Sequence, residues 1–153
     1  MTSTSVKDLI GVEFKPYSFV VERGKILELV NAIGDPNPIY RSLEAAMEAG
    51  YEGIPLPLTG LQPIDNFGGY GFAEKKEVLK GINPTRILHG EQEYEFLGEI
   101  YAGDTLTVTS KLVDVVVKTG GSGGMDLITF ENQYTNQFGR LVAFARNTLI
   151  HRH

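Results

Sequence analysis

The stretch GDPNPIY, residues 34–40, is the part of this 153-residue chain from which its fold and chemistry are most readily inferred. Its two prolines exclude regular helix or strand, and Asn37, which precedes Pro38, is restricted to extended or turn backbone. Asp35 is the one charged side chain in this stiff loop. A second proline-rich loop, IPLPLTG, follows at residues 54–60. Two stiff polar loops so close in sequence favour a pocket between them.

Helical patterns flank the first loop. Upstream, apolar residues recur at the spacing of an amphipathic helix, at Ile26, Leu29, Val30 and Ile33. Gly34 stands where a helix C-terminal glycine is expected. Downstream, Ser42 can cap a short helix over residues 43–49, which Gly50 would end. The loop is therefore predicted to connect two helices.

A third helix is predicted to begin within residues 59–61. Leu61, Ile64 and Phe67 are spaced three apart, as on one side of a helix, and Pro63 is tolerated there only in the first turn. This helix is mostly apolar and should be mostly buried. Residues 73–79 are charged and predict a short exposed helical turn.

The second half of the chain changes to the two-residue period of β-strands. One loose strand is predicted earlier, and four come after residue 86; the ranges are 12–21, 91–96, 105–117, 125–134 and 140–150. The sequence TGGSGG at residues 119–124 is read as a hairpin tip, and residues 136–139 as a tight turn. The apolar phase slips at Leu112–Val113, which predicts a β-bulge there.

One strand, then helices, then four antiparallel strands indicate a single α+β domain over residues 1–153, with residues 1–10 expected to be frayed. The simplest packing lays the apolar helix of residues 61–67 across the concave face of a curved sheet. The two earlier helices would then cover its rim.

Composition narrows the classes of partner. The net charge is −5 and no basic run occurs, so neither nucleic acid nor an anionic membrane is an expected partner. The chain has no cysteine, which excludes disulfides, a thiolate nucleophile and a zinc–thiolate site. No metal site is expected. The start of the chain lacks the apolar core of a signal peptide, and no apolar run could span a bilayer, so a cytoplasmic protein is expected.

The loop and its surroundings resemble the hydratase signature of MaoC-like hot-dog proteins, in which an aspartate and a histidine flank an Asn-Pro turn. The resemblance rests on residues 34–40, Ala45-Ala46, Gly50-Tyr51, residues 88–96, residues 102–106 and Ala145-Arg146. It covers almost the whole chain. These stretches are similar to the N-terminal, dehydratase-like branch, which includes accessory subunits of mycobacterial-type 3-hydroxyacyl dehydratases.

This resemblance implies a hot-dog fold, a curved antiparallel sheet wrapped around a central α-helix. It also implies an acyl thioester of coenzyme A or of a carrier protein as substrate, with no cofactor beyond the CoA or phosphopantetheine that the substrate carries. In catalytic members water adds reversibly to a 2-enoyl thioester. A base must activate the water, and the thioester carbonyl must be polarised as enolate charge develops.

Carried over to this sequence, Asp35 matches the catalytic aspartate, and Tyr40 stands where the histidine should be. Thr59 and Gly60 match the oxyanion region at the start of the central helix, where free N–H groups and the helix dipole favour negative charge. Asn37 and His89 are further candidates for substrate binding. Each has a structural reading too: Asp35 and Asn37 can simply hold the turn, Tyr40 can be a packed aromatic, and His89 can be a structural strand residue.

The tyrosine at position 40 decides what the chain can do alone. A tyrosine titrates near ~10 and a histidine near ~6.5, so at neutral pH tyrosine is a donor and a poor base. Three hypotheses remain: an active hydro-lyase using Asp35 with Tyr40, a non-catalytic substrate-binding subunit, and a hot-dog acyl-CoA thioesterase. In the dehydratase-like branch a second hot-dog subunit brings the full dyad, which favours a hydratase-type assembly.

An oligomer is expected, as a homodimer or as a heterodimer with a second hot-dog subunit. A hot-dog sheet has an outer face, and the strands supply more apolar residues than one helix can cover. The surplus should be buried on that face against another subunit. The residues assigned to this surplus are Tyr94, Phe96, Val113, Val115, Val117, Phe144 and Ile150.

Overall fold

A five-stranded antiparallel sheet in the order β1-β3-β4-β5-β2 forms the body of the molecule in the computed structural model, which describes residues 5–68, 79, 82–121 and 123–153. The strands are β1 (Tyr17–Val20), β2 (Ile87–Phe96), β3 (Thr105–Gly120), β4 (Gly123–Thr135) and β5 (Leu141–Arg152). The helices are α1 (Arg23–Ala32), α2 (Leu43–Glu48) and α3 (Leu61–Gly68), with 3-10 turns η1 (Val6–Leu9), η2 (Pro38–Tyr40) and η3 (Pro84–Arg86). The predicted α+β class is confirmed.

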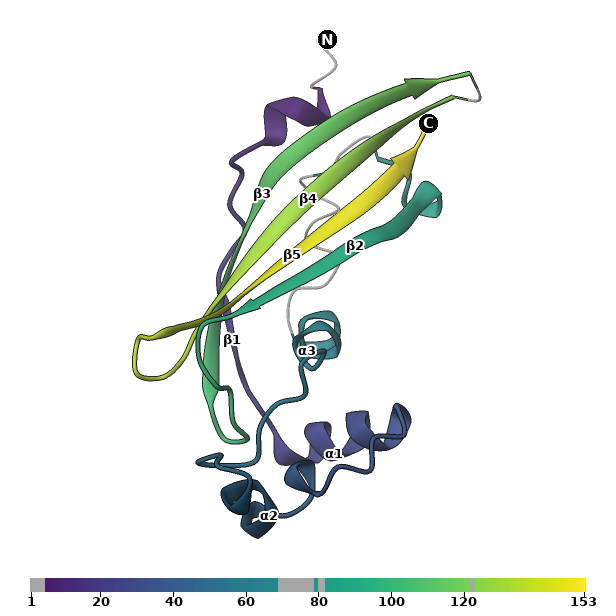
Figure 1. Ribbon diagram of the computed structural model, residues 1–153. Helices are drawn as coiled ribbons and strands as arrows, with labels where there is room; N and C mark the ends of the chain where they lie inside the picture. Colours follow the sequence, from purple (N-terminus) through teal and green to yellow (C-terminus); the bar gives the residue numbers. More distant parts are fainter. Residues whose placement is uncertain (1–4, 69–78, 80–81, 122) are drawn as a thin grey trace.

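The sheet is long and curved, and the helices gather at one end of it. Figure 1 shows α1 and α2 together at that end, with α3 between them and the sheet, while η1 and the C-terminal end of β5 lie at the opposite end. Among the described residues, no helix has the length and apolar character needed to cross a bilayer.

The predicted bulge is present in β3. The register with β4 shifts between Leu112 and Asp114, which leaves Val113 as the extra residue. The hairpin at residues 119–124 is also confirmed, since Gly120 of β3 pairs with Gly123 of β4. The positions of the bulge and of the hairpin could therefore both be predicted from the local sequence.

The interior consists of two apolar clusters on the inner face of the sheet. In the first, Leu61 of α3 and Ile26 of α1 pack with residues of the strands, including Val108 and Tyr134. The second lies towards the other end, where Phe130 and Ile128 pack with Leu112. Helix α3 thus covers the sheet as expected, although the described helix is only eight residues long.

Local capping explains where the first two helices end and begin. Gly34 follows α1 with a φ of 72°, a left-handed conformation that costs glycine little. The Ser42 side chain accepts a hydrogen bond of 3.3 Å from the Ala45 N–H at the start of α2. Both predicted caps are confirmed.

Ser42→Ala is expected to reduce the free energy of unfolding by about 1 kcal/mol, because it leaves a helix N–H without its acceptor. Urea denaturation monitored by circular dichroism measures the change. Ser42→Asn, which keeps a side-chain acceptor, should recover most of the loss. An unchanged midpoint in Ser42→Ala would contradict the assigned cap.

Two expectations about the N-terminal part differ from the structure. The first strand is Tyr17–Val20, shorter than the predicted range 12–21, because Pro16 interrupts it and only Glu13 forms an isolated bridge upstream. The residues after position 4 are not frayed: Ser5 caps the turn Val6–Leu9, whose apolar side chains pack against the second cluster. The predicted helical turn over residues 73–79 lies outside the described residues except for Leu79.

The apolar surplus assigned to the outer face of the sheet was largely wrong. Tyr94 and Phe96 are in register with Ala145 and Ala143 and pack against the first cluster, so they face inward. After the bulge, Val115 and Val117 are in register with the inner residues Ile128 and Asp126 and also face inward. The bulge reverses the alternation, which is the physical reason for the error. Only Phe144 and Ile150 remain clearly outward.

The outer face nevertheless carries one apolar row across four strands. Ile150 is in register with Leu88 on one side and Leu127 on the other, and Leu127 is in register with Val116. Four residues before Ile150 on β5 and on the same face, Arg146 pairs with three glutamates, Glu93, Glu95 and Glu131.

Candidate functional site

The Asp35 loop is held rigid by its own polar groups. The Asp35 N–H donates to the carbonyl of Val30 (2.8 Å), which continues the end of α1. The Asp35 Oδ1 accepts from the Asn37 N–H (2.9 Å), and the Asn37 Oδ1 accepts from the Ile39 N–H (3.2 Å). These are Asx-turn bonds, so both side chains hold the turn. Such a turn fixes the direction of the carboxylate.

Arg41 fastens the loop to α1. Its Nη1 donates to the Asn31 Oδ1 (2.8 Å), and its Nη2 donates to the Asp35 carbonyl (2.9 Å). The guanidinium thus binds the main-chain carbonyl of Asp35 and not its carboxylate. Within the described part of the chain, Asn37 is the hydrogen-bond partner of that carboxylate.

Tyr40 lies at the other end of the loop and packs against the first apolar cluster. Burial raises the pKa of its phenol, and the negative charges of Asp35 and of ionised Tyr51 raise it further. Tyr40 is therefore a protonated hydrogen-bond donor at neutral pH and cannot replace a histidine as base. Because Asp35 influences this pKa, the two side chains lie within electrostatic reach of each other.

The predicted oxyanion region lies at the start of α3, which begins at Leu61 as expected. Gly60 is buried, and its N–H donates to the Pro57 carbonyl at 2.7 Å. A Cβ at Gly60 would come within 2.6 Å of Leu56, so only glycine fits. Since the Gly60 amide has an acceptor within the chain, the exposed Thr59 is the better remaining candidate of the two for an oxyanion donor.

The structure brings the loop and the helix start to one apolar cluster but leaves His89 elsewhere. Tyr40 packs against the first cluster, to which Ile54 and Leu56 belong, so both proline-stiffened loops contact this cluster. His89 lies near the start of β2, at the end of the sheet remote from α1 and α2 (Figure 1), and its Nε2 is 3.4 Å from the Gln92 Oε1. His89 is not part of the Asp35 loop.

A second polar group, centred on Asp65, was missed in the sequence. Its Oδ1 accepts from the Tyr17 hydroxyl (2.6 Å), and its Oδ2 accepts from the Asn132 amide (3.1 Å) and from the Tyr134 hydroxyl. Burial holds the pKa of both phenols well above the usual range, with the charge of Asp65 and the hydrogen bonds to it adding to the shift. The Asp65 cluster, defined as these four residues, joins α3 to β1 and β4.

Tyr94 lies close to this cluster without bonding to it. Burial and the Asp65 charge raise the pKa of the Tyr94 phenol to about 12. Its buried hydroxyl has no hydrogen-bond partner among the described residues. The sequence contained one signal for the cluster: Asp65 is four residues after the fully buried Leu61, so an acid stands on the buried side of an apolar helix.

The comparisons with known proteins agree with this architecture. A family model described as "FAS1-like, dehydratase domain region" matches residues 8–145. A curated relative, a UPF0336 protein of Streptomyces avermitilis, is 31% identical over 147 residues, which cover 95% of this chain and 94% of that protein.

Two solved structures are also similar to this chain. One is the C-terminally truncated HadBC (3R-hydroxyacyl-ACP dehydratase) complex of Mycobacterium tuberculosis, with a TM-score of 0.78, 27% identity, and coverage of 94% of this chain and 97% of that one. The other is a MaoC-like dehydratase, with a TM-score of 0.78, 26% identity, and coverage of 96% of this chain and 43% of that one. The chain therefore belongs to the FAS1-like dehydratase-region family and has the hot-dog fold of MaoC-like dehydratases.

Proposed function

We propose that this chain is the substrate-binding subunit of a hot-dog hydratase or dehydratase in the cytoplasm. Its substrate would be a 2-enoyl or 3-hydroxyacyl group carried as a thioester by CoA or by an acyl carrier protein. The proposal rests mainly on the two residues of the loop that match the dyad positions, Asp35 and Tyr40. A fixed carboxylate, Asp35, is present, but position 40 holds a phenol of raised pKa in place of an imidazole.

The chemistry explains why such a chain would need a partner. Hydration of an enoyl thioester requires a base that takes a proton from water at neutral pH. Asp35 can accept a hydrogen bond from water. Tyr40 is protonated and can form hydrogen bonds, but it cannot take a proton from water. A second hot-dog subunit would bring the complete Asp-and-His dyad and with it the missing base. The similarity to a chain of the HadBC complex supports a heteromeric assembly.

The chain itself would supply the acyl-binding surface and polarise the thioester. Backbone N–H groups near Thr59 and the start of α3 are the proposed donors to the carbonyl oxygen, since a helix N-terminus favours developing negative charge.

The test is hydration of a short 2-enoyl-CoA by the purified chain, with and without a hot-dog partner that carries the Asp-and-His pair. Loss of the enoyl absorbance reports turnover. The isolated chain should be at least about 100-fold slower than the complex, the low end of what a general base contributes. Tyr40→His should raise the rate of the isolated chain. Tyr40→His combined with Asp35→Asn is the matched control and should abolish that gain.

Two results would contradict the proposal. If the isolated chain is as fast as the complex and Asp35→Asn abolishes turnover, the chain is a complete hydratase. If free CoA thiol appears instead of the hydrated product, the chain is a thioesterase.

A further inference from the structure

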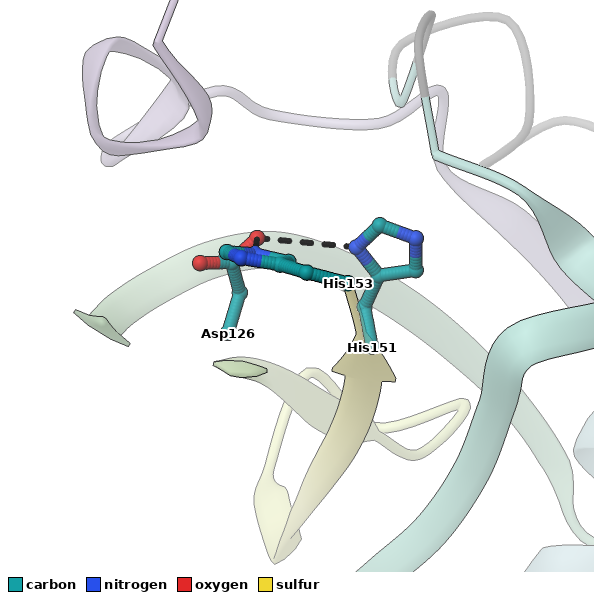
Figure 2. A group of neighbouring side chains, drawn as sticks. All are labelled: Asp126, His151 and His153. Atoms are coloured by element: carbon teal, nitrogen blue, oxygen red, sulfur yellow. Dashed lines mark hydrogen bonds and ion pairs between the residues drawn. The ribbon is translucent and has the colours of Figure 1, made fainter. Parts of the chain in front are cut away.

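Three potential metal ligands meet at the end of the sheet where β5 finishes. Asp126 of β4 is directly in register with His151 of β5, and His153 follows two residues later on the same side of the chain. Figure 2 shows the carboxylate of Asp126 with the two imidazole rings beside it. One carboxylate oxygen and one nitrogen of each ring all lie within 4.8 Å of one another.

The two separations between the carboxylate and the imidazole rings match those of atoms bound to one ion. The Asp126 Oδ2 is 2.9 Å from the His153 Nε2 and 3.5 Å from the His151 Nδ1. Zinc binds nitrogen and carboxylate oxygen at about 2.0–2.2 Å, so ligands at angles of about 90–120° are about 2.9–3.7 Å apart. Both separations fall in this range, and the shorter one is a hydrogen bond between the two side chains in this structure.

Burial also favours an ion at this position. Asp126 is only 5% exposed, which is unusual for a carboxylate at the end of a sheet. The His151 Nδ1 is buried and has no hydrogen-bond partner among the described residues. The Asp126 Oδ2 lies 3.5 Å from this nitrogen, and a cation bound between them would satisfy both once the ring proton is on Nε2.

A glycine leaves the space that the third ligand occupies. A Cβ at Gly124 would lie 2.6 Å from the His153 Nδ1, so an alanine there would push the ring away from Asp126. The His153 N–H donates to the Gly124 carbonyl at 2.9 Å, which holds the main chain of His153 beside β4.

We propose that Asp126, His151 and His153 form a binding site for a divalent transition metal ion, with Zn²⁺ as the best match. Two imidazoles and one carboxylate are a ligand set that suits such ions, and three protein ligands leave a coordination position for water. The exposed His153 side chain keeps the site open to solvent. This site is independent of the Asp35 loop and of the proposed hydratase function.

Metal binding has a consequence for the neighbouring segment. The His151 Nε2 now accepts a hydrogen bond of 3.3 Å from the Asn83 N–H, so the ring proton is on Nδ1. A neutral imidazole that binds a metal through Nδ1 carries its proton on Nε2, which can then no longer accept from Asn83. Since Asn83 caps η3 just before β2, the ion should weaken this contact.

The experiment is calorimetric titration of the untagged full chain with Zn²⁺ after treatment with a chelator. One ion per chain should bind. His153→Gln and Asp126→Asn should each weaken binding at least about 100-fold, since even outer partners of a metal ligand are worth about 10–100-fold. His89→Gln changes the one histidine of the sequence that lies outside the proposed site. It is the matched control and should leave the affinity unchanged.

Two further measurements distinguish a built site from non-specific binding. Gly124→Ala keeps all three ligands and should still weaken binding, whereas Gly121→Ala, where a Cβ meets nothing within 4 Å, should not. In nuclear magnetic resonance spectra, the Asn83 amide should shift on addition of Zn²⁺. Absence of binding, or binding that His153→Gln and Gly124→Ala leave unchanged, would overturn the proposal.

Discussion

Asp65→Ala is expected to lower the free energy of unfolding by about 3 kcal/mol, which makes it one of the two largest effects predicted for this protein. The substitution removes the acceptor of two tyrosine hydroxyls and of the Asn132 amide at once. Each donor left unsatisfied in a buried place costs about 1–3 kcal/mol, and the total is reduced because Asp65 and Tyr17 are only partly buried. Urea denaturation measures the loss.

A double-mutant cycle identifies the cause of that loss. Tyr134→Phe removes one hydroxyl without changing the shape of the ring. In the wild-type background it should cost about 1.5–3 kcal/mol, the value of a hydrogen bond to a charged group. In the Asp65→Ala background it should cost much less, because the hydroxyl has already lost its acceptor.

The control for this cycle is Asp114→Ala, which removes an exposed carboxylate from β3. It should change the free energy of unfolding by no more than about 0.5 kcal/mol. Equal effects of Asp65→Ala and Asp114→Ala would show that the Asp65 cluster does not stabilise the fold.

Alkaline pH is expected to destabilise the protein steeply, which is the second large effect. Burial and Asp65 raise the pKa of Tyr17, Tyr94 and Tyr134, in the case of Tyr94 to about 12. In the unfolded chain these phenols ionise near ~10. Above that pH the unfolded state binds fewer protons than the folded state, so the stabilisation is complete below about pH 10 and is lost as the pH rises.

The slope of the unfolding free energy against pH sums the contributions of the tyrosines with a raised pKa, including the more exposed Tyr40. Each phenol contributes at most about 1.4 kcal/mol per pH unit, and partial exposure of Tyr17 and Tyr94 makes their contributions smaller. Urea denaturation between pH 9 and pH 11, with phenolate absorbance followed in parallel, measures the slope. Tyr134→Phe should reduce it by nearly one proton. A slope that Tyr134→Phe leaves unchanged would contradict the assignment.

Short-range features could be predicted because their causes lie within a few residues. The cap at Ser42, the left-handed Gly34 and the bulge at Leu112–Val113 each depend on neighbours in sequence. The Asx-turn of Asp35 is of the same kind. The family resemblance then gave the hot-dog fold, which the similar structures confirm.

The faces of the sheet show where such reasoning failed. The bulge was predicted, yet Val115 and Val117 were still assigned to the outer face. A single extra residue reverses every side chain after it, so the face of a strand depends on its register with the next strand. The register between two strands cannot be predicted from the sequence of either strand alone.

By itself the sequence determined the local geometry of this protein: the helix caps, the turns, the bulge and a loop with a fixed aspartate and no histidine. Only the tertiary structure decided which distant side chains meet. Asp65 reaches Tyr17 and Tyr134 across 48 and 69 residues, and Asp126 meets His151 because β4 and β5 are in register. The physical reason is that hydrogen bonds and ligand sets form between neighbours in space, and in a sheet these neighbours are set by strand pairing.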